Sequence, residues 1–240
     1  MLLDDRRVFR RRVFLTTLLA LVVVFVLWNV PGFDFITYPL RLFVTYVHEA
    51  GHSLAAVISG GQVLGFEVFE NGGGVAYTSG GARWLILPAG YLGAALFGAI
   101  LFYLANRLRY VEFLSACMAV LLLFFPLLLN SQSLTAMMVG LGFGLLFLLM
   151  TIRASRDLNR LVLAVLAAMT GLNAVMDLLF LTRNPEIGAG ATINDAAKFA
   201  QEVAPALSPW MVAVGWAAIA VLLLLISFYY SVVRPLRRGL

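Results

Sequence analysis

Charged residues are scarce in this chain. They make up 12% of the 240 residues, against about 25% in a soluble domain, while 62% of the residues are hydrophobic. This composition excludes an ordinary soluble domain, and several apolar runs reach the roughly 20 residues that a helix needs to cross a bilayer. Because the backbone must satisfy its own hydrogen bonds in lipid, the sequence predicts an all-α polytopic membrane protein. The net charge of +5 comes largely from arginines beside the apolar runs, a pattern typical of membrane flanks rather than of nucleic-acid binding.

Cysteine and histidine are almost absent. The only cysteine, Cys117, lies within an apolar run, so no disulfide can form within the chain, and we interpret Cys117 as a small packing residue. The only two histidines, His48 and His52, belong to one short segment, His-Glu-Ala-Gly-His. Any chemistry that requires imidazole is therefore confined to residues 48–52.

The spacing of these histidines predicts a metal site. On a helix, residues four apart share a face, so His48 and His52 point the same way and can hold one ion. Glu49 stands beside them, where it can take a proton from metal-bound water. The alternative is a hydrogen-bonded cluster in the core, but two histidines and a glutamate are costly in an apolar helix without a metal.

Seven apolar segments predict about seven transmembrane helices, with six as the lower bound, in a single membrane domain over 1–240. The first segment follows a basic start and lacks a small-residue cleavage pattern before Pro31, so we expect an uncleaved span. Residues 62–81 are instead rich in strand formers on both sides of a glycine-rich turn. This predicts a β-hairpin directly after the histidine-bearing helix; a loop without a role is the alternative. The predicted spans are 13–28, 35–59, 84–105, 113–129, 134–151, 161–181 and 209–230.

Two further segments have ordinary structural interpretations. The small residues in 88–95 predict close helix packing, with no chemistry of their own. Within the long polar connection 182–208, the sequence from Thr192 to Asp195 predicts the start of a short interfacial helix, with Thr192 as its cap.

The third metal ligand can be sought by elimination. A catalytic zinc usually takes three protein ligands and leaves one position open, and no third histidine exists. Asp177 is the only acidic residue besides Glu49 that lies inside a predicted span; Asp195 and the others lie in tails, loops or span edges. A carboxylate in a span costs about 2.5–3.5 kcal/mol unless it is compensated, so Asp177 is the predicted ligand, with pairing to an arginine or a buried amide as the alternative. Asn173, one turn earlier, could orient Asp177, bind substrate backbone or bridge two helices.

These motifs resemble the site-2 proteases, the intramembrane zinc metalloproteases of peptidase family M50, and most of all the M50B-like bacterial branch. The shared features are the histidine motif, the Gly60-Gly61 pair that follows it, and Ala-Gly-Tyr-Leu-Gly at residues 89–93. The chain departs from better-known members because the segment around Asp177 lacks their proline and glycine. The assignment of Asp177 as the third ligand therefore depends on elimination as much as on the resemblance.

The resemblance implies a Zn²⁺ enzyme of the bacterial cytoplasmic membrane that hydrolyses a peptide bond in or near a transmembrane segment of a membrane-protein substrate. His48, His52 and Asp177 would hold the zinc, and Glu49 would be the general base. It also implies that the hairpin lies on the cytoplasmic side, where it could take up an unwound substrate as an added strand; the basic N-terminus favours a cytoplasmic start as well. The alternatives are a zinc sensor or scaffold without catalysis, and a transporter that uses the same residues as an ion site, although no internal repeat supports the latter.

Overall fold

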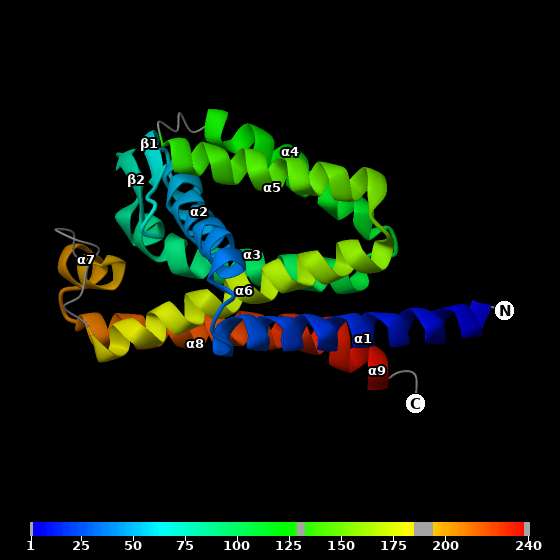
Figure 1. Cartoon of the computed structure of the whole chain (residues 1–240). Coiled ribbons are helices and arrows are strands. Elements are labelled where there is room, and N and C mark those ends of the chain that lie inside the picture. Colours follow the sequence, from blue (N-terminus) through cyan, green and yellow to red (C-terminus); the bar gives the residue numbers. More distant parts are fainter. Residues whose placement is uncertain (1, 129–132, 185–193, 238–240) are drawn as a thin grey trace.

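The computed structural model describes residues 2–128, 133–184 and 194–237 (Figure 1). Long helices dominate it, and a two-stranded antiparallel sheet follows the second helix. The predicted all-α membrane architecture with one hairpin is confirmed. The elements are α1 (Leu2–Asn29), α2 (Asp34–Ile58), β1 (Gln62–Val68), β2 (Gly74–Ser79), α3 (Arg83–Arg107), α4 (Val111–Leu128), α5 (Leu134–Arg153), α6 (Arg156–Arg183), α7 (Asp195–Glu202), α8 (Pro209–Phe228), the π-helical turn η1 (Tyr229–Val233) and α9 (Arg234–Arg237).

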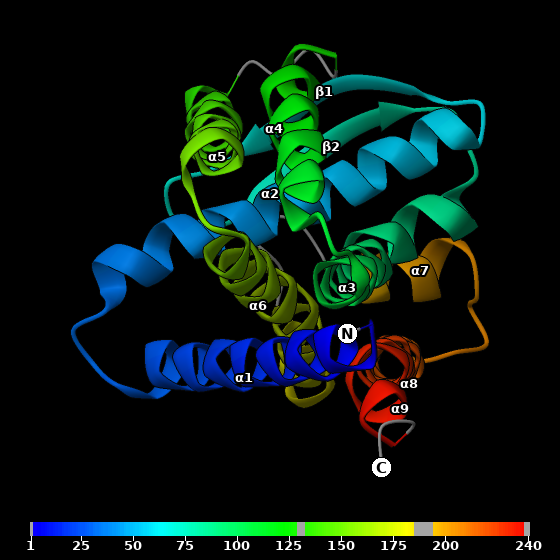
Figure 2. The ribbon, with the colours of Figure 1, turned by 90° about the vertical axis from the view of Figure 1, so that its right-hand side faces the viewer.

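Six helices within the described ranges are long and apolar enough to cross a membrane: α1, α3, α4, α5, α6, and α8 with its continuation to Arg237. Together with the composition, they identify an integral membrane protein. The histidine-bearing helix α2, predicted as the second span, is not among them. Figure 2 views α3 and α8 nearly along their axes, and α2 lies across them. The polar residues that α2 brings to the site make it less apolar than a spanning helix.

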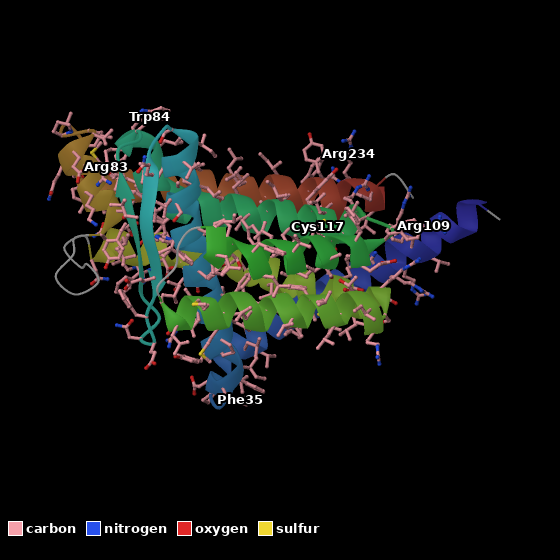
Figure 3. All side chains as sticks on the ribbon, turned by 90° about the horizontal axis from the view of Figure 1, so that it is seen from above. Phe35, Arg83, Trp84, Arg109, Cys117 and Arg234 are labelled. Atoms are coloured by element: carbon pink, nitrogen blue, oxygen red, sulfur yellow. The ribbon has the colours of Figure 1, made fainter. Side chains whose placement is uncertain are left out.

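Both termini lie at the same end of the bundle (Figure 1), as expected for an even number of candidate spans in the described ranges. The hairpin and α7 lie at the opposite end in Figures 1 and 3. The expectation that the N-terminus and the hairpin share the cytoplasmic side is therefore wrong. Because α2 lies across the bundle and does not traverse it, one crossing, α1, separates the N-terminus from the hairpin.

Close contact between α2 and α3 depends on small residues. A Cβ placed on Gly51 would lie 2.1 Å from the carbonyl oxygen of Ala89, and one on Gly93 would lie 3.5 Å from the Cα of Gly51. Only glycine at position 51 permits this approach. The predicted packing role of the 88–95 segment is confirmed.

The predicted hairpin is also confirmed, with a bulge between Val63 and Gly65. Phe66 and Val68 of β1 are fully buried, and the ring of Phe66 packs edge-on against Tyr46 of α2 at 4.9 Å. At the tip, the hydroxyl of Thr45 donates to the carbonyl of Gly72 at 2.7 Å. The strand β1 is therefore anchored in the core, and β2 is left facing the histidines.

Candidate metal centre

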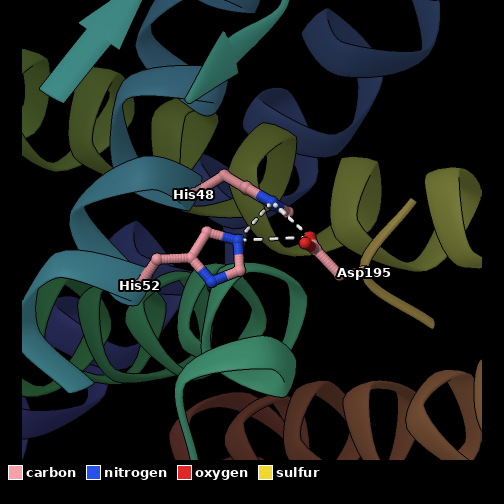
Figure 4. Close-up of side chains that lie close together, drawn as sticks. All are labelled: His48, His52 and Asp195. Carbon is pink, nitrogen blue, oxygen red and sulfur yellow. Dashed lines mark hydrogen bonds and ion pairs between the residues drawn. The ribbon is translucent and has the colours of Figure 1, made fainter. Parts of the chain in front are cut away.

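The two histidines of α2 converge on a carboxylate from α7. The Nε2 atoms of His48 and His52 lie 3.1 Å apart, and Oδ2 of Asp195 lies 3.3 Å from the first and 3.2 Å from the second (Figure 4). One ligand atom from each residue falls within 4.8 Å of the others. Two imidazole nitrogens and one carboxylate oxygen are a donor set suited to zinc.

The orientation of the His52 ring is fixed by a hydrogen bond from the ring nitrogen that does not contact Asp195. Its Nδ1 donates a hydrogen bond to the carbonyl of Ile86 at 2.7 Å, so the neutral ring carries no proton on Nε2 and directs that lone pair toward His48 and Asp195. The ring of His48 packs edge-on against Tyr91 at 4.5 Å. Such outer partners set the tautomer and the direction of a metal ligand.

A glycine of α3 makes room for the site. A Cβ on Gly90 would lie 2.4 Å from the Nε2 atoms of both His48 and His52. Every other residue type would occupy the space between the imidazoles. The sequence had assigned residues 88–95 to packing alone, so this contribution of Gly90 to the site was missed.

The three ligand atoms are arranged so that a cation could bind between them. With Nδ1 of His52 already donating, at most one of the short contacts among the three atoms can be a neutral hydrogen bond unless an imidazole gains a proton. Burial favours the neutral form of His52, but the Asp195 carboxylate raises the pKa of His52 to about 9. Burial likewise favours protonated Asp195, yet His52 and His48 hold the pKa of Asp195 well below its usual range. Zinc binding requires neutral imidazoles and an ionised carboxylate, which these three residues can supply, so the residues present fit the metal.

Glu49 lies next to the ligands and beside the hairpin. It is 6% exposed, and its carboxylate accepts a hydrogen bond from the backbone N–H of Ala76 in β2. A Cβ on Gly74 would lie 2.7 Å from Cγ of Glu49, so glycine allows β2 to approach this closely. Burial raises the pKa of the Glu49 carboxyl, although His48 and His52 oppose the shift. A raised carboxyl pKa suits a general base.

The predicted third ligand, Asp177, lies in the same cavity but outside the group formed by the three ligand atoms. It accepts a hydrogen bond from Nδ2 of Asn173 at 3.1 Å. The structure thus brings Asp195, and not Asp177, against both histidines. The elimination had set Asp195 aside because it lies in a polar connection; α7 instead packs on α3 and α8 at the site.

Helix α7 is held by contacts on both sides. Its cap is Asn194, whose side chain accepts from the N–H of Ala197 at 2.9 Å, so the predicted cap at Thr192, a residue outside the described ranges, is corrected. Phe199 packs edge-on against Trp216 of α8 at 5.3 Å, and Arg83 of α3 forms an ion pair with Glu202 at 2.6 Å. The short helix itself is confirmed. These contacts place Asp195, its first residue, at the histidines.

A family model described as Peptidase M50B-like matches residues 17–227, which include α2, the hairpin and α7. The chain belongs to the Peptidase M50B-like family. Comparison with curated proteins and with solved structures gives no match. Family membership indicates an intramembrane metalloprotease in general, in a lipid environment, and the histidine–aspartate group is placed to bind the metal that such an enzyme requires.

The M50B-like site opens into a cavity of about 670 Å³. One wall is β2 from Gly74 to Thr78, all of the strand except Ser79, and another includes Asp177. Within the described residues β2 pairs only with β1, and on its other edge the N–H of Ala76 is bonded to Glu49. The cavity therefore joins the ligand group, a buried carboxylate and a strand edge in one space.

Proposed function

We propose that this M50B-like protein is a zinc endopeptidase that cleaves a membrane-protein substrate in or near a transmembrane segment, with His48, His52 and Asp195 as the zinc ligands. The observation that carries the proposal is the meeting of three ligand atoms beside buried Glu49 at the wall of a cavity. Asp195 takes the place that the sequence had assigned to Asp177.

Bound zinc would supply a Lewis acid that polarises a peptide carbonyl and makes water a better nucleophile. Glu49, held by the N–H of Ala76, takes the proton of the attacking water and returns it to the leaving amine. A sensor or scaffold would have no use for a base at this position, which favours the protease over a metal-binding protein without catalysis.

The edge of β2 away from β1 gives the substrate a place to bind beside Glu49. An unwound segment can add to it as a strand, with its backbone hydrogen-bonded along the cavity wall. Asp177 lines this space from α6 and accepts a hydrogen bond from Asn173, and we assign the pair to substrate contact rather than to the metal. This places the scissile carbonyl between the hairpin and the ligand group.

The metal assignment is tested by metal analysis of the protein purified in detergent. Wild type and Glu49→Gln should each hold one zinc ion per chain, while His48→Ala should hold none. A wild-type protein that binds no zinc after incubation with the metal would contradict the proposal.

Orientation follows from the arginines. The α3–α4 loop, where Figure 3 labels Arg109, and the α5–α6 connection lie at the same end as both termini (Figures 1 and 3). Arg107 is the last residue of α3, Arg153 the last of α5, and Arg156 the first of α6. Arginine-rich short loops face the cytoplasm, so we assign this end to the cytoplasmic side of a bacterial cytoplasmic membrane. The hairpin and the metal site then lie toward the opposite side.

Thiol labelling tests the orientation. In a Cys117→Ala background, an impermeant maleimide should label Asn71→Cys, at the hairpin tip, in intact cells. It should label Arg153→Cys only after the membrane is opened. The reverse pattern would overturn the orientation and leave the protease proposal intact.

A further inference from the structure

A second cavity lies at the end of the bundle away from the metal site. It has a volume of about 770 Å³ and is lined by α1, the C-terminal end of α3, the start of α6, and η1 with α9. Figure 3 shows Arg109 and Arg234 at this end, opposite the hairpin. The N-terminal and C-terminal helices thus meet around one space that the proposed proteolysis does not use.

The lining of this cavity is strongly basic. Asp157 is its only acidic residue, and it is shared between Arg12 at 3.9 Å and Arg160 at 3.4 Å. Arg10, Arg107 and Arg109 have no carboxylate partner among the side chains that the structure describes. The lining arginines are Arg10, Arg12, Arg107, Arg109, Arg156 and Arg160. Their excess of positive charge is suited to an anion.

Two buried polar groups in the lining lack partners. Asn106 is 1% exposed and Ser231 is 2% exposed. Nδ2 of Asn106 and Oγ of Ser231 have no hydrogen-bond partner among the described residues, although Oδ1 of Asn106 accepts from Thr17. A buried donor without a partner costs stability. Both groups can donate, and they come from different helices that border the same cavity.

Apart from Ser155, the rest of the lining is apolar and belongs to helices that are long and apolar enough to cross a membrane, with Phe9 and Phe14 from α1 and Val232 from η1. A ligand that suits this lining carries an anionic oxygen group and a hydrocarbon part. We infer that the cavity binds the phosphate headgroup of an anionic phospholipid, with arginines and the Asn106 and Ser231 donors around the phosphate.

Arginines that only set the orientation of the chain in the membrane would not need to be gathered around a cavity. Arginines that only fix topology can point separately into water, whereas the side chain of Arg160 is 3% exposed and its guanidinium donates to the carbonyls of Ala105 and Leu108. Arg160 thereby joins α6 to the end of α3 and shapes the cavity. Arg10, Arg107 and Arg109, which have no carboxylate partner among the described side chains, then remain for the ligand.

Two double variants separate lipid binding from a general loss of charge. Arg10→Gln with Arg107→Gln removes two arginines that line the cavity, and Arg11→Gln with Arg153→Gln removes two at the same end that do not. Purified full-length protein in a zwitterionic detergent would be titrated with short-chain phosphatidylglycerol, with phosphatidylcholine, and with inorganic phosphate. The bound lipid would be counted by native mass spectrometry.

Phosphatidylglycerol should bind wild type and the Arg11/Arg153 variant alike. The Arg10/Arg107 variant should bind it roughly 30-fold more weakly, about fivefold for each arginine. Ser231→Ala should fold normally and weaken binding by a smaller factor. Equal binding in both double variants, equal binding of phosphatidylcholine, or full occupancy by inorganic phosphate at the same concentrations would overturn the assignment to a phospholipid.

Discussion

Oδ2 of Asp195 lies 3.2 Å from Nε2 of His52 although 143 residues separate them in the chain. This contact joins the helix that carries the histidines to a short helix from a polar connection. It makes Asp195 the carboxylate that completes the donor set.

Asp195→Asn should remove zinc and Asp177→Asn should not. Both residues line the same cavity, so the pair is matched in charge and surroundings. Residues that hydrogen-bond to a metal ligand contribute about 10–100-fold to metal affinity. Loss of the ligand Asp195 itself should therefore weaken zinc affinity by at least about 100-fold. Zinc titration against a competing chelator measures this, and zinc loss in Asp177→Asn alone would restore the sequence-based assignment.

The elements of this fold could largely be predicted from the sequence because hydrophobic run length and strand-forming composition are local signals. The histidine pair and Glu49 could be found because their chemistry depends on spacing along one helix. Asp195 could not, because its position depends on how α7 packs against α3 and α8. No pattern within residues 182–208 predicts that long-range contact. The sequence favoured Asp177 because it is the acidic residue, besides Glu49, that lies within an apolar span. The direction of α2 also depends on packing, which is why α2 is not one of the six candidate spans and why the hairpin and the N-terminus lie at opposite ends.

Gly90→Ala should abolish zinc binding, since its Cβ would lie 2.4 Å from both histidine Nε2 atoms. Gly93→Ala is the matched control on the same helix, because its Cβ would make an ordinary 3.5 Å contact. Zinc content and helical circular dichroism would be measured together. Full zinc occupancy in a folded Gly90→Ala protein would show that the site does not need this space.

Gly74→Ala should slow proteolysis while zinc stays bound. The added methyl would lie 2.7 Å from Cγ of Glu49 and 2.8 Å from Thr45, and a displacement of about 1 Å at a catalytic group can cost about 100-fold in rate. In Gly73→Ala the nearest contact is a side-chain oxygen at 3.3 Å, so this variant should keep its activity. Equal cleavage rates for the two variants, on any substrate of the wild type, would contradict the claim that catalysis depends on the close approach of β2 to Glu49.

The Arg83–Glu202 ion pair should contribute modestly to metal affinity by holding α7. Both side chains are 43% exposed, and exposed pairs contribute about 0.2–1 kcal/mol. Arg83→Gln should therefore weaken zinc binding by no more than about fivefold. The exchange Arg83→Glu with Glu202→Arg should recover part of the loss; an exchange no better than the single variant would argue against this role.

The account is tested most directly by comparing membrane proteomes of the native cell with wild type and with Glu49→Gln at matched expression. Glu49 is not one of the three residues placed to bind zinc. The variant should therefore keep the metal and lose only the base. We predict that at least one membrane protein accumulates uncut in the variant and is cleaved in wild type. Identical proteomes, with both proteins expressed and loaded with zinc, would contradict the protease and favour a metal-binding role without catalysis.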